Sequence, residues 1–137
     1  MPEYMLLVYE EEVDRDGQVE RERDLPVLMQ MHRSLREAGL LGTVRALRSV
    51  ETATSVRVRD GATEITDGPF AVTKEVLAGL YVLDCADLDE ALKLAARLPQ
   101  SRWGTLEVRP VVSADDWVRT ADRAGVELSD EDLSTLT

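Results

Sequence analysis

The 137-residue chain is short of several residue types. It has one cysteine and one histidine, so it cannot form an internal disulfide and lacks a His/Cys cluster of the zinc-binding kind. A single cysteine also favours a reducing, cytoplasmic location. The apolar run Met5–Val8 is too short to span a membrane, and no basic segment precedes it as in a signal peptide.

Basic residues are also few, with 16 against 27 acidic ones and a net charge of −11. Because nucleic-acid binding depends on neutralising phosphates, this balance argues against direct nucleic-acid binding and against anionic membrane surfaces. The segments Glu10–Asp24 and 113–137 each carry a net charge of −5. We therefore expect a solvated acidic loop at Glu10–Asp24, an acidic helical extension over 113–137, and a nearly neutral remainder.

The sequence contains no motif that would identify a cofactor or metal. It has no phosphate-binding glycine loop and no nucleophile elbow, and Asp14–Gly17 is only a fragment of a calcium loop. Cys85 is flanked by Asp84 and Asp87, which raise a thiol pKa and argue against a nucleophile. We expect no cofactor and no metal, and interpret the acidic stretches as solvated surface.

Residues 1–112 predict one compact domain with an aliphatic core, because aromatic residues make up only 4% of the chain. Strands are expected at Tyr4–Tyr9, about 43–50, within Thr54–Thr66 as a hairpin, at Ala78–Asp84 and at Thr105–Val112. Tyr4–Tyr9 and Ala78–Asp84 are apolar on both faces, which is typical of central strands.

The hairpin signal is the Asp60-Gly61 turn. A two-residue loop there places opposite charges on one face of the hairpin and apolar groups on the other. The resulting pairs are Val56 with Ile65, Arg57 with Glu64, and Arg59 with Ala62.

Two helices complete the expected domain. The first begins after Asp24, ends near Gly39 and presents a stripe of Leu25, Leu28, Met29, His32, Leu35 and Arg36. The second begins after Asp87, which forms a capping pair with Glu90, and presents Leu88, Ala91, Leu92, Ala95 and Leu98. A short third helix, capped by Ser113 and Asp116, is expected through Ala124.

The order β-α-β, hairpin, β-α-β predicts an α+β ferredoxin-like sandwich. Helices of such a fold cover one face of the sheet, and the other face still carries apolar side chains. A second copy packing sheet to sheet as a homodimer is the economical cover, giving a dimeric α+β barrel. The C-terminal extension is the alternative cover.

The segment Asp67-Gly68-Pro69-Phe70, followed by Thr73-Lys74-Glu75, resembles the DGPF branch of the YCII-related family. Residues 1–112 carry the resemblance, and further similar segments are Tyr4–Leu7, Thr54–Asp60, Gly79–Asp84, Asp87–Asp89 and Glu107–Pro110. The resemblance implies a dimeric α+β barrel and includes enzyme-like relatives that act on aromatic substrates. The resemblance also implies a regulatory link, because genes of this branch often neighbour genes for extracytoplasmic-function sigma factors.

Relatives outside this branch carry a histidine early in the first helix that is discussed as catalytic. The histidine of this chain, His32, lies later in that helix, and its role is not carried over. On its own residue chemistry His32 is a candidate proton carrier, with a packed histidine at the core edge as the alternative.

The candidate site centres on the Asp67 segment. Asp67 is a candidate rim carboxylate or a turn-forming residue, and Phe70 a candidate apolar wall. Lys74 and Glu75 are candidates for holding an anionic ligand or moving a proton, with an exposed ion pair as the alternative. Further candidate ligand contacts, each also explained by packing or surface pairing, are Tyr9, Tyr81 and Arg109.

Two functions are expected from these features. In the first, the protein is a cytoplasmic homodimer that binds a small organic ligand beside Asp67, Phe70, Lys74 and Glu75, and acts as a cofactor-free enzyme or a binding protein. In the second, it is an interaction module that uses its acidic surface, including the 113–137 extension, on a basic partner associated with a sigma factor.

Overall fold

The computed structural model describes all residues 1–137 and contains a four-stranded antiparallel sheet in the order β2–β5–β1–β6. This is the ferredoxin-like strand order and confirms the predicted α+β fold. The strands are β1 Glu3–Glu11, β2 Leu41–Ala46, β5 Glu75–Asp84 and β6 Gly104–Pro110. The long strands β1 and β5 are central, as their apolar composition predicted.

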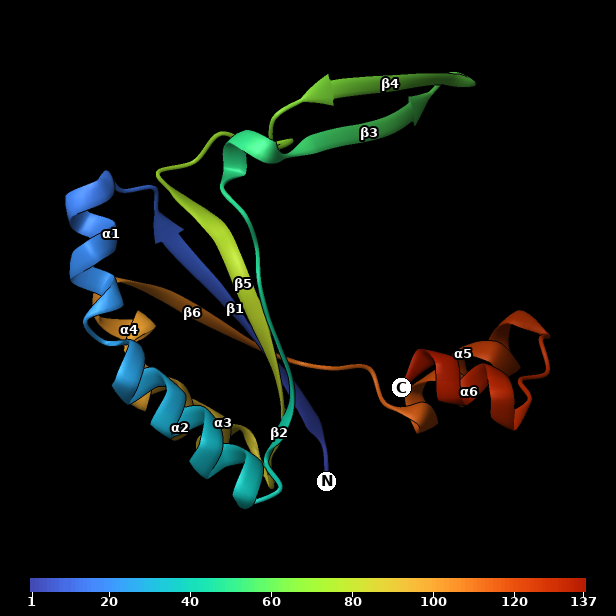
Figure 1. Cartoon of the computed structure of the whole chain (residues 1–137). Helices are drawn as coiled ribbons and strands as arrows, with labels where there is room; N and C mark the ends of the chain where they lie inside the picture. Colours follow the sequence, from blue (N-terminus) through green and yellow to red (C-terminus); the bar gives the residue numbers. More distant parts are fainter.

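Helices cover one face of this sheet (Figure 1). The covering layer contains α2 Leu25–Glu37, α3 Leu88–Arg97 and the short α4 Gln100–Trp103. The Asp87 side chain accepts a hydrogen bond from the Glu90 backbone N–H, 2.9 Å away, so the predicted cap of α3 is confirmed.

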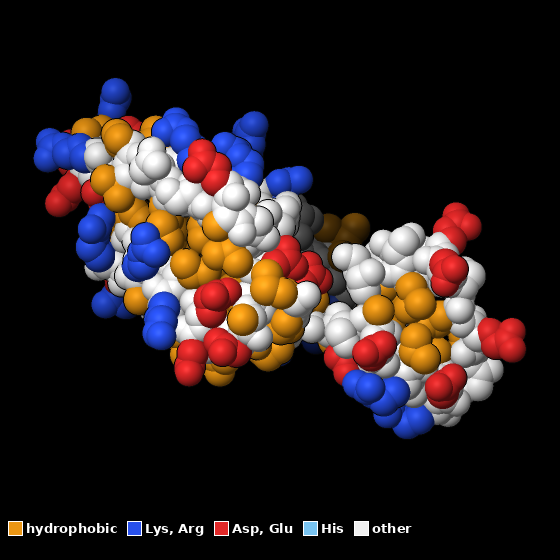
Figure 2. Space-filling view, turned by 90° about the horizontal axis from the view of Figure 1, so that it is seen from below, with side chains coloured by type: hydrophobic (Ala, Val, Ile, Leu, Met, Phe, Trp, Pro, Cys, Tyr) orange, Lys and Arg blue, Asp and Glu red, His pale blue; other side chains and the backbone are white.

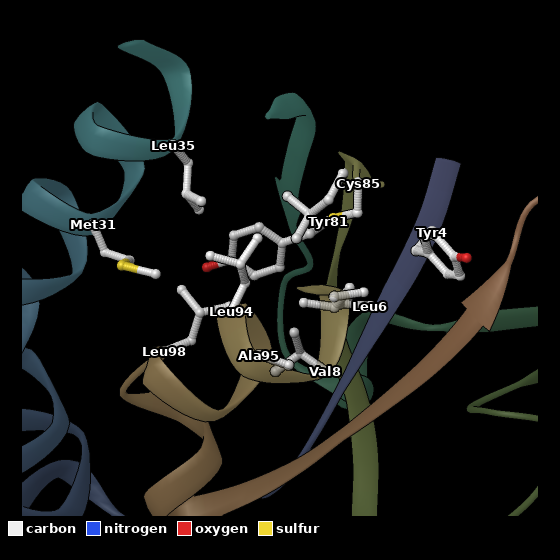
Figure 3. Close-up of a cluster of buried hydrophobic side chains, with 12 residues drawn as sticks. Tyr4, Leu6, Val8, Met31, Leu35, Tyr81, Cys85, Leu94, Ala95 and Leu98 are labelled. Atoms are coloured by element: carbon white, nitrogen blue, oxygen red, sulfur yellow. The ribbon is translucent and has the colours of Figure 1, made fainter. Parts of the chain in front are cut away.

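The core lies between these helices and the central strands (Figure 3). Alternation along β1 and β5 directs every second side chain toward the helices. The buried set includes Tyr4, Leu6, Val8, Tyr81 and Leu83 from the strands, with Met31, Leu35, Leu94 and Leu98 from the helical layer. The core is largely aliphatic, as the shortage of aromatic residues requires.

The opposite face of the sheet, here called the open face, has an apolar centre. It consists of the alternate side chains Met5, Leu7 and Tyr9 of β1 and Leu80 and Val82 of β5, all of them half-buried. No helix of the chain packs over it, because α2 and α3 lie on the other side (Figure 1).

The prediction of a loop over Glu10–Asp24 is wrong, because this stretch contains helix α1, Arg15–Glu22. The helix has no apolar stripe and no buried residue, so hydrophobic periodicity does not reveal it. It is held instead by polar contacts. The Asp14 carboxylate accepts from the Gly17 N–H at 2.8 Å, and the Arg21 guanidinium donates to the Glu10 carboxylate at 2.9 Å.

The predicted buried stripes of α2 and α3 are correct only in part. Leu25 and Arg36 of α2 are exposed, and Met31 is buried in their place. In α3, Leu88 and Leu92 are nearly half exposed, and Leu94 is buried instead. Each helix therefore presents a slightly rotated face to the sheet. Asp24 also makes no side-chain capping bond, and the second strand is shorter than the predicted 43–50.

The hairpin has the predicted register. Strands β3 Thr54–Arg59 and β4 Ala62–Asp67 pair Val56 with Ile65 and Arg57 with Glu64. Asp60 and Gly61 both have positive φ, 52° and 76°, which the two-residue turn requires. The hairpin forms a separate two-stranded sheet that projects away from the helices (Figure 1).

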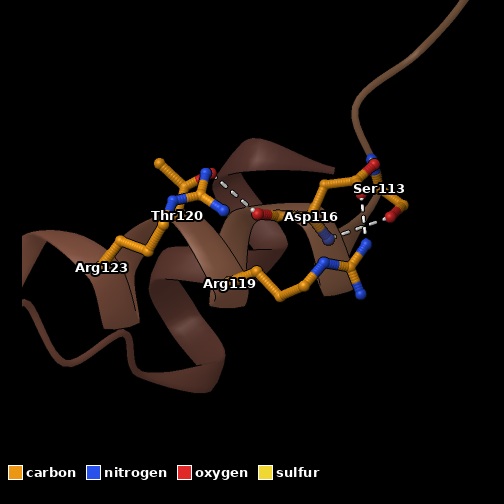
Figure 4. A network of polar contacts seen from close by, with 5 residues as sticks. All are labelled: Ser113, Asp116, Arg119, Thr120 and Arg123. Carbon is orange, nitrogen blue, oxygen red and sulfur yellow. Dashed lines mark hydrogen bonds and ion pairs between the residues drawn. The ribbon is translucent and has the colours of Figure 1, made fainter.

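The C-terminal extension contains two helices, α5 Ala114–Ala124 and α6 Asp130–Leu136, whose main contacts are with each other. Ser113 and Asp116 form the predicted capping box of α5 (Figure 4). The second helix was not predicted. The pair stands apart from the sheet, so it leaves the open face uncovered (Figure 1). The apolar side chains of this helix pair gather on one face, and most of the charged side chains around them are acidic (Figure 2).

Candidate functional site

A pocket of about 480 Å³ lies where the loop after the hairpin meets the end of β1. We call it the Lys74 pocket. Its lining residues are Gly68, Pro69, Val72, Thr73 and Lys74 of the loop, with Glu11, Glu12, Val50, Glu51 and Val76 around them. The volume is within the range of small-molecule sites. Part of the Asp67–Glu75 segment therefore borders a ligand-sized space, as the first predicted function requires.

Lys74 and Glu75 lie together at the end of the sheet. The Lys74 ammonium lies 3.2 Å from the Glu11 carboxylate, and both groups are exposed. The Glu75 carboxylate accepts a hydrogen bond from the Thr105 hydroxyl at 3.0 Å, which ties β5 to the edge strand β6. Lys74 reaches the pocket, whereas Glu75 stands next to it and is engaged with its neighbour strand.

Asp67 and Phe70 do not line the pocket. Asp67 ends β4 opposite Thr54, and its carboxylate makes no hydrogen bond or ion pair. The neighbouring Gly68 has a φ of 101°, and its N–H donates to the Ala53 carbonyl at 2.8 Å. Phe70 is 94% exposed. In a single chain Asp67 therefore lies outside the pocket at the end of its strand, and Phe70 lies on the outer surface of the loop.

A second hollow of about 380 Å³ adjoins the Lys74 pocket and shares Glu11, Glu12 and Val76 with it. Two of its lining residues, Glu10 and Arg21, belong to a polar cluster that the sequence did not predict. The half-buried Glu10 carboxylate accepts from the Arg21 guanidinium at 2.9 Å and from the Trp103 indole at 3.2 Å. Because Trp103 is 93 positions from Glu10, only the folded chain reveals this cluster.

His32 and Tyr81 lie on the helical side of the sheet, away from the Lys74 pocket. The His32 Nε2 atom lies 2.7 Å from the Tyr81 hydroxyl, which also accepts from the Gln100 side-chain amide at 2.8 Å. Tyr81 is 2% exposed and Gln100 is 9% exposed. No sequence motif marks Gln100, so this third member was not predicted.

The electrostatics of this trio favour neutral groups. Burial, followed by the positive charge of Arg36, lowers the pKa of His32. Burial is also the main cause that raises the pKa of Tyr81, with Glu10 adding to it and the Gln100 hydrogen bond opposing it. A hydrogen bond between a neutral imidazole and a neutral phenol holds α2 on the sheet, and this geometry supports packing more directly than proton transfer.

The remaining candidates lie apart from the pocket. Tyr9 is on the open face, opposite Thr105, and Arg109 is an exposed residue of β6 opposite Met5. Cys85 is fully buried, and its pKa is raised by burial, then by Glu90 and neighbouring aspartates. These surroundings agree with the expectation that Cys85 is not a nucleophile.

No group of three or more His, Cys, Asp and Glu side chains is arranged to hold a metal ion. None of the helices has the length and apolar character needed to cross a bilayer. The groups that line the Lys74 pocket are three carboxylates, one ammonium and aliphatic side chains, and these set the chemistry available there.

Comparison with known proteins places this arrangement in a family. The model of the YCII-related domain matches residues 2–117. An uncharacterised protein of Rhizobium meliloti (strain 1021) is 41% identical over 112 residues, which span 79% of this chain and 90% of that protein. The match to the family model includes the sheet, the hairpin and the loop of the Lys74 pocket, and it reaches only the start of α5. The chain belongs to the YCII-related family.

Proposed function

We propose that this protein binds a small organic molecule in the Lys74 pocket. The observation that carries the proposal is the pocket itself, a space of about 480 Å³ bordered by the Gly68–Lys74 loop. Of the four predicted site residues, Lys74 contributes directly and Glu75 stands beside it. Asp67 ends β4 directly before the loop that forms one wall.

The charges around the pocket favour one class of ligand. Glu11, Glu12 and Glu51 supply three carboxylates against the single ammonium of Lys74. Glu11 is paired with Lys74, and Glu12 accepts from the Val50 N–H at 2.9 Å, which leaves Glu51 without an ion pair. A molecule with an amine and an aliphatic or aromatic body fits this lining better than an anion. Turnover without a cofactor would use Lys74 and Glu75 as the proton-transfer groups.

A homodimer is part of the proposal. The open face has five apolar side chains at its centre and no cover from its own chain. Exposed Arg45 and Arg109 lie on strands β2 and β6 at its two sides, and neither forms an ion pair within the chain. An apolar centre with a polar rim is the usual anatomy of an interface, and a two-fold axis would pair two such faces.

The chain offers a direct test, because Lys74 and Lys93 are its only lysines. Reductive methylation with ¹³C keeps both charges and gives each lysine its own NMR signal. Titration with a set of small aromatic and aliphatic amines should shift the Lys74 signal and leave that of Lys93, exposed on α3, unchanged. Glu51→Gln removes the carboxylate that has no ion pair and should weaken binding of any amine found at least tenfold, with Glu127→Gln, at an exposed carboxylate outside the pocket, as the matched control. Lys74→Met frees the Glu11 carboxylate and should leave amine binding equal or tighter, with Lys93→Met as its control. Equal shifts at both lysines, or amine affinities unaffected by Glu51→Gln, would contradict the site.

The helix pair α5–α6 favours a second candidate function, that of a regulatory interaction protein. The segment 113–137 carries a net charge of −5, folds on itself and leaves an apolar patch exposed. Its partner would be a basic protein, and the family resemblance suggests one associated with a sigma factor. A pull-down from the native host at low salt, with the full chain and with residues 113–137 removed, tests this. Recovery of no transcription protein by the full chain would count against it.

A further inference from the structure

The hairpin has an apolar face that nothing in its own chain covers. Val56, Val58 and Ile65 share this face and are 68%, 57% and 71% exposed. Arg57 and Glu64 share the other face, where their charged groups lie 3.8 Å apart. The sequence therefore specifies a hairpin with one apolar and one charged face, but both faces are exposed in the single chain.

An isolated two-stranded hairpin is at best marginally stable in water. The main contacts of β3 and β4 are with each other, so the domain adds little support. Phe70 and Val72, which follow β4 in the chain, are also apolar and are 94% and 95% exposed. These five side chains together present apolar surface on the order of 500 Å². Patches of this size on a soluble protein mark interaction sites.

We propose that the hairpin and the following loop, residues 54–72, form an arm that packs its apolar face on a second copy of this chain. The inference rests on the homodimer proposed above and extends it. The arm projects on the side of the sheet away from α2 and α3, which is the side of the open face (Figure 1). When two open faces meet about a two-fold axis, each arm therefore extends beside the partner's sheet.

The area also favours a second copy. A standard stable interface buries about 1,200–2,000 Å² in total. Two arms supply on the order of 1,000 Å² of their own, and the two open faces supply the rest. A foreign partner that took only the arm would leave the adjacent open face exposed, whereas a second copy covers both surfaces at once.

Sedimentation equilibrium of the full chain tests the arm. The double substitution Val56→Lys with Ile65→Lys places two charges on the apolar face. The matched control, Arg57→Ser with Glu64→Ser, alters the other face of the same hairpin. We expect the apolar-face variant to raise the dimer dissociation constant at least 100-fold, and the control to stay within threefold of the unmodified chain. Circular dichroism should show the four-stranded domain intact in both, because the hairpin makes no part of its core.

A second measurement does not depend on those variants. A nitroxide attached at Arg57→Cys, in a Cys85→Ala background, is mixed with ¹⁵N-labelled chains that carry no nitroxide. Broadening of amide signals in the β-sheet of the labelled chains shows that the arm lies on the partner.

The outcomes separate the two proposals. A dimer that survives Val56→Lys with Ile65→Lys and shows no broadening between chains would overturn the arm and leave the sheet-to-sheet dimer standing. A chain that remains monomeric at 100 μM would overturn both. Ligand binding at the Lys74 pocket is read separately from the lysine NMR signal.

Discussion

The hydroxyl of Tyr81 is the polar centre of an otherwise apolar core, and its removal gives a quantitative test of the structure. Tyr81→Phe keeps the ring among Leu6, Leu94 and Leu98 (Figure 3) and removes only the oxygen. That oxygen has two partners within 2.8 Å, His32 and Gln100. The change therefore separates hydrogen bonding from packing.

The expected loss follows from the burial of the two partners. The Gln100 amide, in a residue that is 9% exposed, would lose its acceptor inside the core, and an unsatisfied buried donor costs about 1–3 kcal/mol. His32 is only half-buried, so water can replace its lost bond at a cost of about 0.5 kcal/mol. We therefore expect Tyr81→Phe to lower the free energy of unfolding by about 2–3 kcal/mol.

Urea unfolding followed by circular dichroism measures this difference. Protein concentration is held constant across variants, because the stability of an oligomer depends on it. Tyr4→Phe is the matched control, since Tyr4 is a core tyrosine whose hydroxyl makes no hydrogen bond in the structure. The control should change the free energy of unfolding by less than about 0.5 kcal/mol.

A double-mutant cycle with Gln100→Leu decides between hydrogen bonding and other causes. Gln100→Leu removes the amide that Tyr81→Phe would leave unsatisfied, together with the Gln100 Oε1 atom, which is buried without a partner. In that background Tyr81→Phe should cost less than about 1 kcal/mol. A cost below about 0.5 kcal/mol in the unmodified chain, or the same cost in both backgrounds, would refute the reasoning.

Three further outcomes are expected. Because folding lowers the pKa of His32, the full free energy of unfolding is present above the usual histidine pKa near 6.5 and falls as the pH drops through and below that value. Urea unfolding at pH values from 7.5 to 5 should show a steeper loss of stability for the unmodified chain than for His32→Gln, and parallel pH profiles of the two proteins would contradict this expectation. Ser113→Ala removes the cap of α5 and should destabilise that helix by about 1 kcal/mol, seen as lost helical circular dichroism with the main melting transition unchanged. Gly104→Ala places a Cβ against the carbonyl oxygen of Tyr9 and should destabilise the domain by about 2–3 kcal/mol in thermal melts, whereas a neutral result would show that β6 can move away from β1.

The fold was predictable because its signals are local. The two central strands, the Asp60-Gly61 turn and the caps at Asp87 and Ser113 each depend on residues within a few positions of one another. The strand order then follows from the order of elements. The exact buried stripes of α2 and α3 were not predictable, because the rotation of a helix on a sheet depends on packing across the layer.

Helix α1 shows the opposite case. The surrounding segment Glu10–Asp24 has eight acidic residues and a glycine, and the helix within it has no apolar stripe, so the local sequence predicts a loop. Two of the bonds that hold it run from Arg21 to the strand that precedes it, and the indole of Trp103 joins the same carboxylate. Such long-range polar contacts leave no periodic signal in the sequence.

The candidate site was predictable as a segment and not as a set of contacts. Gly68 and Pro69 indicate a special loop, and that loop does border a pocket. The partner of Lys74 is Glu11, 63 positions earlier, and only the pairing of β1 with β5 brings them together. The outward position of Phe70 likewise depends on the direction in which the hairpin leaves the sheet.

The strand pairing at the far end of the sheet has a topological consequence. Tyr4 of β1 lies opposite Pro110 of β6, and the Val111 N–H donates to the Glu3 carbonyl at 2.9 Å. The two ends of the ferredoxin-like unit therefore meet at one point of the surface. A unit closed in this way can be circularly permuted, or inserted into a loop of another protein, through a linker of a few residues. It can also carry an appended segment such as α5–α6 without disturbing the sheet from which that segment departs.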